Sequence, residues 1–240
     1  MGERVPSDYE RDPGRFRTAR AIQRRHALVP DIHERVARRL LAERLTPVLD
    51  IGCGEGELAR HLPPGAWVGV DNSTVMLAAA PLPNVRAEAT ALPFPDDSFP
   101  SAALLYVLYH LADPSLALIE AHRVLRSAGL LAVAAPSRRD SPELAHALPE
   151  WSLTFDAERA PELLEEHFAD VELVRWDAPL VELPTRAAVR DYLIGKGTDP
   201  ERAQAAAKEV ELPLSVTKRG SLAFARKRPY SSRAEASKRR

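Results

Sequence analysis

The segment that decides the fold is "VLDIGCGEGELARHL", residues 48–62, in which an apolar run is followed by Gly52, Gly54 and Gly56. Glycine inside regular structure is costly because it loses more backbone entropy on folding than any other residue. These glycines therefore indicate a turn where a ligand approaches bare backbone N–H groups. We expect "ELARHL" to begin a helix, whose positive N-terminal end would favour an anion at this turn.

Short segments that are apolar on successive residues recur along the chain, as is typical of parallel strands covered on both faces. Helical patterns lie between them; one has Asp113 as N-cap and Pro114 in the first turn. The alternation predicts an α/β fold, a Rossmann-like seven-stranded, mostly parallel sheet with helices on both faces and a helical insertion before the last strand. We predict strands at 47–51, 66–71, 84–88, 101–106, 129–135, 168–176 and 221–227.

Composition sets limits on function. The 240 residues include 33 basic and 34 acidic side chains, so net charge provides no whole-molecule field for nucleic acid. The single cysteine, Cys53, excludes an internal disulfide, and no Cys/His spacing resembles a metal site. No apolar run reaches membrane-spanning length. We therefore expect a cytoplasmic protein with no membrane association, and the excess of arginine and alanine is typical of GC-rich bacterial coding.

An acidic residue follows the next predicted strand. Asp71 lies about twenty residues after the glycines, where a carboxylate can accept two hydrogen bonds from ribose hydroxyls. The dinucleotide-binding fingerprint requires a glycine three residues after Gly54, but Glu57 stands there, and Asp50 precedes the first glycine closely. The pattern therefore disfavours an NAD enzyme.

"VLDIGCGEG" followed by "VGVDNS" resembles the first two motifs of class I S-adenosylmethionine-dependent methyltransferases. "AEATALPFPDDSF", "LLYVLYHLADP" and "EAHRVLRSAGLLAVAAP" are similar to later motifs of the small-molecule branch that includes ubiquinone and menaquinone biosynthesis methyltransferases. The resemblance extends from Val48 to Pro136. It implies S-adenosyl-L-methionine as cofactor and transfer of a methyl group to an O, N or C atom of a small organic molecule.

The resemblance also implies site residues. Backbone N–H groups of the glycine turn would bind the methionine carboxylate, Asp50 would balance the cationic part, and Asp71 would bind the ribose. Met76 would pack on the adenine or simply in the core, and Glu88 would accept from the adenine amino group. Cys53 is either a reactive thiol or, as we favour, a small buried filler. The full predicted cofactor-binding set is Asp50, Gly52, Cys53, Gly54, Gly56, Asp71, Asn72, Met76, Glu88, Ala89 and Tyr106.

Three positions depart from the family pattern. Glu88 stands where the family usually has Asp, so its longer side chain changes the distance to the adenine. "SFP" replaces the common "SFD", and Pro100 removes a backbone donor at the start of a strand. "RSAG" replaces "KPGG", which removes one glycine from the turn into the fifth strand but keeps Gly129.

Methyl transfer needs an acceptor held in line, and a base helps when the acceptor is protonated. His110 is the predicted catalytic residue, with helix packing as the alternative, whereas His122 is predicted to lie in the core. Trp151 and Trp176 border the predicted lid and either pack or stack on a flat substrate. The arginines of the N-terminal segment either close over the site or form a solvated face: Arg15, Arg17, Arg20, Arg24 and Arg25.

We expect residues 1–30 to form an N-terminal cap segment and residues 31–228 to form the methyltransferase domain. Within it, 177–214 would be the helical lid insertion, and 229–240 would be a disordered basic tail. The predicted partner is a small-molecule methyl acceptor and not nucleic acid; the sequence does not predict an oligomeric state. Two alternatives stay open: methylation of RNA or another macromolecule, and cofactor binding without catalysis.

Overall fold

The computed structural model describes residues 13–28, 31–150 and 153–228. The predicted tail at 229–240, residues 1–12 of the predicted cap segment and Trp151 lie outside these residues. The side chains of Arg15 and Arg20 are likewise outside the description.

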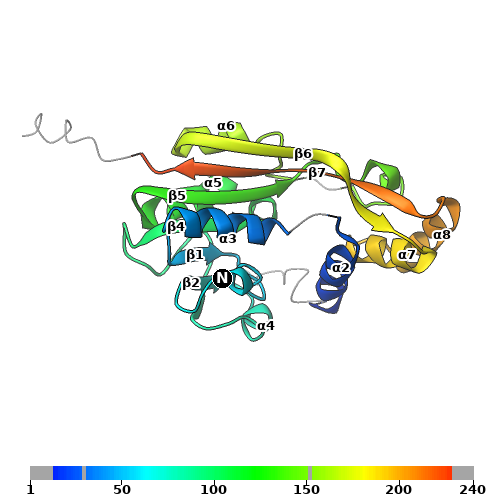
Figure 1. Ribbon diagram of the computed structural model, residues 1–240, viewed down its shortest axis with the longest axis horizontal. Helices are drawn as coiled ribbons and strands as arrows, with labels where there is room; N and C mark the ends of the chain where they lie inside the picture. Colours follow the sequence, from blue (N-terminus) through cyan, green and yellow to red (C-terminus); the bar gives the residue numbers. More distant parts are fainter. Residues whose placement is uncertain (1–12, 29–30, 151–152, 229–240) are drawn as a thin grey trace, which may run out of the picture.

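Seven strands form one sheet in the order β3-β2-β1-β4-β5-β7-β6. Strands β1 to β5 are parallel to one another, and β7 is antiparallel to both β5 and β6. The predicted Rossmann-like fold is confirmed (Figure 1). The strands are β1 (Val48–Ile51), β2 (Trp67–Asp71), β3 (Asn84–Arg86), β4 (Phe99–Leu105), β5 (Leu125–Pro136), β6 (Ala169–Leu183) and β7 (Leu214–Arg226).

Helices pack on both faces of the sheet. One core contains α5 (Pro114–Val124) and α6 (Ala160–His167). The opposite core contains α3 (Ile32–Ala42), and Leu77 at the end of α4 (Thr74–Leu77) packs against it. Asp113 caps α5 by accepting from the Ser115 N–H at 3.0 Å, with Pro114 in the first turn, as predicted. The sheet is buried on both sides because its parallel strands are apolar on successive residues.

Three more helices lie beyond the carboxyl ends of the parallel strands, at the right of Figure 1: α2 (Pro13–His26), α7 (Arg186–Gly195) and α8 (Pro200–Glu209). Pairing between β5 and β7 stops at Pro136 and Gly220, but β6 and β7 continue to pair as far as Leu183 and Leu214. This antiparallel extension projects past the sheet and carries α7 and α8. We call the extension together with α2, α7 and α8 the cap.

The cap has a small apolar core of its own, to which the segment after β5 contributes Leu144 and Leu148. Residues 177–183 and 214 were expected to belong to a helical insertion, but they are strand. Pro179 argued against a strand in the sequence, because proline lacks the N–H that a β-ladder needs. In the structure the pairing of β6 with β7 shifts register between Pro179 and Val181, and a strand tolerates proline at such an irregularity. The two predicted helices are present as α7 and α8, and Asp199 caps α8.

The helix expected to follow the glycines is not an α-helix. Residues Leu58–His61 form a single short 3-10 helix, which ends at Leu62 in extended backbone. Pro63 and Pro64 follow, and a residue before proline is disfavoured in the helical region, so the helix cannot continue. One short turn carries little dipole, and the predicted attraction of an anion by a helix N-terminus therefore does not apply here.

Pro100 alters its strand as expected. Strand β4 begins at Phe99, two residues earlier than predicted, and its register with β5 shifts between Phe99 and Ser101. The missing N–H of Pro100 accounts for the irregularity.

Candidate cofactor and acceptor site

The three glycines at the end of β1 all adopt positive φ: +71° for Gly52, +55° for Gly54 and +76° for Gly56. This left-handed backbone is the reason why glycine is required here. A Cβ atom on Gly52 would lie 2.5 Å from a methyl group of Val107, whereas one on Gly54 would meet no atom within 4 Å. The turn is therefore packed tightly against Val107, which follows β4, on one side and is open on another.

The N–H groups of the turn already have acceptors within the protein. Gly52 and Cys53 both donate to the Val70 carbonyl, at 2.7 and 2.9 Å, and Gly56 donates to the Cys53 carbonyl at 2.9 Å. Gly54 donates to Asp71 Oδ2 at 2.9 Å. The binding of a carboxylate by N–H groups of this turn stays a prediction. What the glycines provide in this geometry is close approach of the backbone.

Asp71 ends β2 beside the turn. Its two oxygens accept from the Gly54 and Ser73 N–H groups, each at 2.9 Å, which fixes the orientation of the carboxylate. Burial raises the pKa of Asp71, although these backbone donors oppose the rise. A carboxylate has about four lone-pair sites, so each oxygen can still accept from a diol. The arrangement fits a ribose beside the open side of Gly54.

Asp50 lies within the sheet, and its side chain accepts from Trp67 Nε1 at 3.0 Å. Sequence reasoning missed this indole donor, although the parallel register of β1 and β2 places both residues on neighbouring strands. Burial, followed by the charges of Asp50 and Asp71, raises the pKa of the Cys53 thiol. A thiol held neutral in this way is a poor nucleophile, which supports the filler interpretation.

The structure brings Asn72 and Glu88 together, since Asn72 Nδ2 donates to Glu88 Oε2 at 3.0 Å. Glu88 is exposed and Ala89 half-buried beyond the end of β3, so both lie near the carboxyl edge next to Asp71. Met76 on α4 is buried, with 2% of its surface exposed. Their predicted roles toward an adenine stay predictions.

Tyr106 follows β4 directly and has a φ of +61°, which is rare for a non-glycine residue. Its N–H donates to the Ala134 carbonyl at 2.9 Å, and burial raises the pKa of its hydroxyl. His110 is exposed, and its ring centroid lies 4.1 Å from that of Tyr109. Tyr106 and His110 both follow β4, at the edge of the sheet where the glycine turn lies. A proton-transfer role for His110 stays a prediction.

His122 is half-buried and packs against Phe168 of the core, so it lies at the edge of the core and not fully within it. Its ring meets Phe168 edge-on at 5.4 Å, and burial lowers its pKa. Trp176 packs over Gly220 against the core on the α3 face, which favours the packing interpretation for this indole.

The N-terminal arginines reach the glycine turn. Arg17 Nε donates to Glu55 at 2.6 Å, and Arg24 donates to both oxygens of Glu57 at 3.1 and 3.3 Å. Two of the predicted arginines therefore contact carboxylates of the protein itself. The Leu28 N–H donates to the Leu180 carbonyl, which attaches the end of α2 to the extension of β6.

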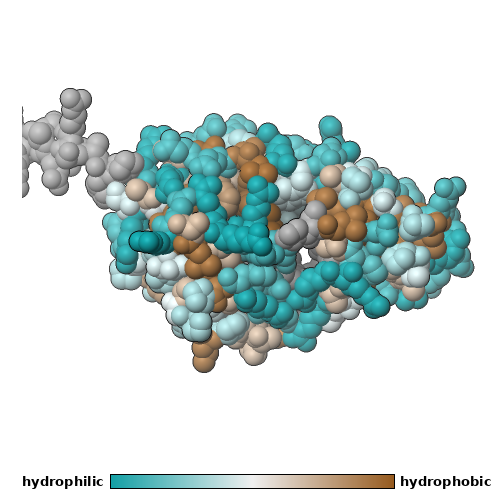
Figure 2. Space-filling view, viewed as in Figure 1, coloured by the Kyte–Doolittle hydropathy of each residue, from teal (hydrophilic) through white to brown (hydrophobic). Residues whose placement is uncertain are grey.

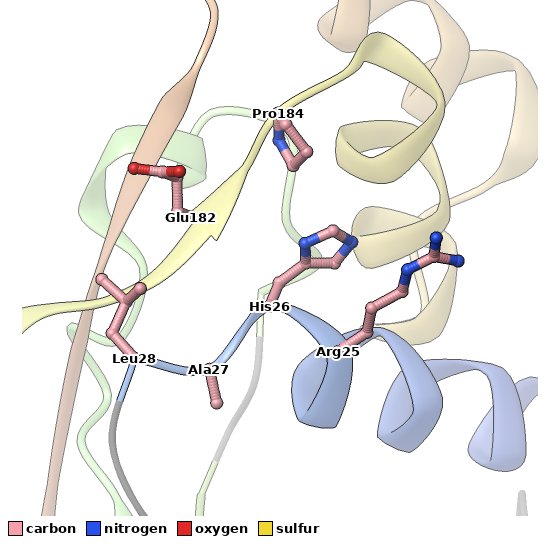
Figure 3. A pocket seen from close by; sticks show the side chains of 6 residues that line it. All are labelled: Arg25, His26, Ala27, Leu28, Glu182 and Pro184. Atoms are coloured by element: carbon pink, nitrogen blue, oxygen red, sulfur yellow. The ribbon is translucent and has the colours of Figure 1, made fainter.

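A small cavity of about 150 Å³ lies where α2 ends, lined by residues that include His26, Leu28 and Glu182 (Figure 3). It faces β6 and is lined by Arg25, one of the N-terminal arginines, but by none of the predicted cofactor-binding residues. A second cavity of about 330 Å³ lies at the carboxyl end of β5 and is lined partly by Ser137, Trp176 and Arg219.

In the described part of the chain, no group of three or more His, Cys, Asp or Glu residues could hold a metal ion. Among the same residues, no helix combines the length and the apolar character needed to cross a bilayer.

Residues 49–133 match the family described as "Methyltransferase domain". A demethylmenaquinone methyltransferase from Roseiflexus castenholzii is 37% identical over 108 residues, 40% of this chain and 45% of that protein. A malonyl-[acyl-carrier protein] O-methyltransferase from Dechloromonas aromatica is 33% identical over 157 residues, 61% of this chain and 56% of that protein. The chain thus spans about half the length of these curated relatives.

Among solved structures, the YcgJ protein from Bacillus subtilis superposes with a TM-score of 0.60 at 19% identity, covering 81% of this chain and 99% of that one. At this identity the likeness concerns the fold alone. Together, the matching residues 49–133 and the strand order show a class I, Rossmann-like methyltransferase domain in this chain. The domain resembles those of quinone biosynthesis methyltransferases, and its cofactor is S-adenosylmethionine.

Proposed function

We propose that the protein transfers a methyl group from S-adenosylmethionine to an O, N or C atom of a small organic molecule. The observation that carries the proposal is the Asp71 carboxylate, held by the Gly54 and Ser73 N–H groups beside the open side of the glycine turn. When bound, the cofactor supplies an electrophilic methyl group on a sulfonium. The protein's part is to bind, orient and exclude water.

Each end of the cofactor has residues that fit it. Asp71 accepts from the ribose hydroxyls, while Asn72, Glu88, Ala89 and Met76 surround the position expected for the adenine. Asp50 is a buried carboxylate beneath the turn, and its negative charge favours a cationic group nearby. Tyr106 immediately precedes Val107, whose side chain packs against Gly52.

The small-molecule acceptor is supported by the names of the relatives, one acting on demethylmenaquinone and one on malonyl-[acyl-carrier protein]. The cap supports it as well, because it covers the carboxyl edge of the sheet with helices and would leave a long polymer little access.

The proposal is tested by calorimetry, which compares the affinity of the wild type and of Asp71→Asn for S-adenosylhomocysteine. In Asp71→Asn the new side-chain amide would place an N–H donor where the ribose hydroxyls and the Gly54 N–H need an acceptor oxygen. Loss of a charged hydrogen bond costs about 1.5–3 kcal/mol, so we expect affinity to fall about 10- to 100-fold. Glu166→Gln, which neutralises an exposed carboxylate on α6, is the control and should bind like the wild type.

Product analysis then separates the alternatives. We expect radiolabelled methyl groups to appear in small molecules from a panel of phenols, carboxylic acids and amines, and not in RNA. Binding without any methylated product would favour a non-catalytic protein, and unchanged binding by Asp71→Asn would remove the basis of the proposal.

A further inference from the structure

The larger of the two cavities lies where the β6–β7 extension leaves the sheet. Pairing between β5 and β7 stops at Pro136 and Gly220, and Ser137 and Gly220 both line the cavity. Its volume of about 330 Å³ is within the range of about 300–1,000 Å³ that small-molecule sites occupy. Figure 2 shows the surface hollowed between the sheet and the cap, the junction at which this cavity lies. None of the residues that line it belongs to the predicted cofactor-binding set, so it is a candidate site for another ligand.

The side of the cavity made by β6 and β7 carries an excess positive charge. Arg175 and Asp177 both line it from β6, and Arg219 lines it from β7. Arg219 Nε donates to Asp177 Oδ1 at 2.9 Å, so these two charges neutralise each other. Arg175 is exposed and forms no hydrogen bond or ion pair with any part of the chain that the structure describes. One guanidinium on this side is therefore unmatched.

The side made by the segment before α6 carries an excess negative charge. Asp156 is fully buried, and its Oδ1 accepts from the N–H groups of Glu158 and Arg159, at 3.0 and 2.8 Å. Arg138 pairs with Asp156, and its charge also acts on Glu158. Two carboxylates therefore share one guanidinium, and Glu158 is the one that lines the cavity.

The unmatched carboxylate is held in place. Glu158 accepts from the hydroxyl of Ser137, a residue that is only 5% exposed. The Ser137 N–H donates to the Arg219 carbonyl at 3.0 Å, which ties this support to β7. Among the described residues, no ion pair joins Glu158 to Arg175, although both line the same cavity. The two opposite charges are thus too far apart to neutralise each other directly.

A buried hydroxyl beside Arg175 gives a second, independent indication of a ligand. Ser221 on β7 pairs in register with Arg175, so the two side chains leave the sheet on the same face. Ser221 is 1% exposed, and its Oγ has no hydrogen-bond partner in the described part of the chain. Buried polar groups are nearly always hydrogen-bonded, because leaving one unpaired costs free energy. The positive side of the cavity therefore favours a polar ligand atom.

We propose that this cavity binds a small zwitterion, with a carboxylate at Arg175 and an ammonium group at Glu158. A guanidinium matches a carboxylate through two parallel N–H donors, and an ammonium donates to the oxygens of a carboxylate. The proposal adds a binding site to the proposed methyl transfer and does not depend on it.

A ligand with a single charge fits this cavity less well. The four charged residues that line it, Glu158, Arg175, Asp177 and Arg219, sum to zero. A simple carboxylate would satisfy Arg175 but would add a negative charge near Glu158, and a simple amine would do the reverse. Only a ligand with both charges satisfies both sides.

The test compares five probes in ligand-observed NMR titrations of the full chain. Glycine, 4-aminobutyrate and 6-aminohexanoate carry both charges at increasing separation, whereas butyrate and butylamine carry one each. The titrations contain saturating S-adenosylhomocysteine, so that no probe binds in its place. We expect at least one zwitterion to bind about tenfold more tightly than butyrate and butylamine.

Arg175→Gln and Glu158→Gln each remove one charge and should each weaken the preferred zwitterion about tenfold. The exchanged variant, Arg175→Glu with Glu158→Lys, should recover part of the affinity, because the ligand can bind in the reversed direction. Arg126→Gln is the matched control, since it removes an exposed strand arginine at the opposite end of β5 from the cavity. An unchanged Tm of Arg175→Gln checks that this variant folds.

The inference is overturned if the wild type binds none of the three zwitterions, or if butyrate or butylamine binds as tightly as the best of them. It is also overturned if Arg175→Gln or Glu158→Gln binds that zwitterion like the wild type. Failure to bind S-adenosylhomocysteine would instead overturn the proposed function, and the comparison of variants would still locate the zwitterion.

Discussion

The glycine turn and the cap are built in opposite ways. The turn is made by residues within one short segment, and its closest partners, Val70 and Asp71, belong to the adjacent parallel strand. The cap joins α2, the segment after β5 and the β6–β7 extension, so its hydrogen bonds link residues as far apart in the chain as Leu28 and Leu180 or Glu143 and Thr217. One region depends on backbone conformation, and the other on tertiary packing. Substitutions should therefore damage one region without damaging the other.

The largest effect is expected in the cap, from Asp140→Asn. The change leaves the buried ammonium of Lys218 without its counter-ion. Removing one partner of a buried pair costs about 3–5 kcal/mol, which lowers the Tm by about 10 °C in a protein of this size. Thermal unfolding at neutral pH measures it. Asp177→Asn breaks the exposed pair with Arg219 and should cost under about 1 kcal/mol; equal losses would show that the buried pair of Asp140 and Lys218 is not a stabilising contact.

The same substitution has a pH signature. Burial by itself would raise the pKa of Asp140, but Lys196 and Lys218 outweigh it and hold the pKa below 3.8. A carboxylate with a depressed pKa in the folded state stabilises the protein above its unfolded pKa, and this contribution is lost as the pH falls through the folded pKa. The stability difference between wild type and Asp140→Asn should stay constant from pH 7 to about 5 and shrink below about pH 4. A difference independent of pH would contradict the assignment.

The next largest effect belongs to the glycine turn. Gly52→Ala places a side chain at φ +71° and within 2.5 Å of Val107. We expect affinity for S-adenosylhomocysteine to fall about 10- to 100-fold, equivalent to about 1.4–2.8 kcal/mol. Calorimetry measures the loss, and Gly52→Ala combined with Val107→Ala should recover part of it.

Gly65→Ala is the matched control for this change. Gly65 has a φ of +81°, but a Cβ atom there meets nothing within 4 Å. Gly65→Ala introduces backbone strain without a steric clash, and it does so outside the turn. The variant should therefore bind S-adenosylhomocysteine like the wild type. An equal loss of affinity in both variants would show that local packing at Gly52 is not what shapes the site.

A smaller, stabilising effect is expected from Ala128→Gly. Ala128 occupies a φ of +60° at the position where the resembled family has glycine. Relief of this strain should stabilise the protein by about 0.5–1 kcal/mol and raise the Tm by about 1–4 °C, without changing cofactor affinity. Ala145→Gly, at a φ of −56°, should not stabilise, and calorimetric melting of both variants tests the difference.

The smallest effect concerns the link between the two regions. Arg24 and Glu57 join α2 to the glycine turn, but the Arg24 side chain is 45% exposed. A double-mutant cycle with Arg24→Ala and Glu57→Gln should give a coupling of about 0.5 kcal/mol that weakens with added salt. A coupling several times larger would mean that the cap and the turn act as one unit.

Local rules explain which expectations were accurate. The strands β1, β2, β4 and β5 were found because burial on both faces leaves continuous apolar runs, and the α5 cap was found from Asp113 and Pro114. The helix after the glycines was wrongly expected because the effect of Pro63 on the preceding backbone was not weighed. The extension of β6 was missed because Pro179 interrupts the strand pattern, and no local pattern indicates that these residues pair with β7.

The sequence by itself determined the sheet, its order of elements and the glycine and Asp71 pair, because backbone conformation and burial leave their pattern in neighbouring residues. Only the tertiary structure decided that the three glycine N–H groups of the turn donate within the protein, that Trp67 donates to Asp50, and that Lys196 and Lys218 share Asp140. Those facts depend on hydrogen bonds between side chains and strands far apart in the chain. Such contacts follow from how the layers pack and leave no periodicity to detect.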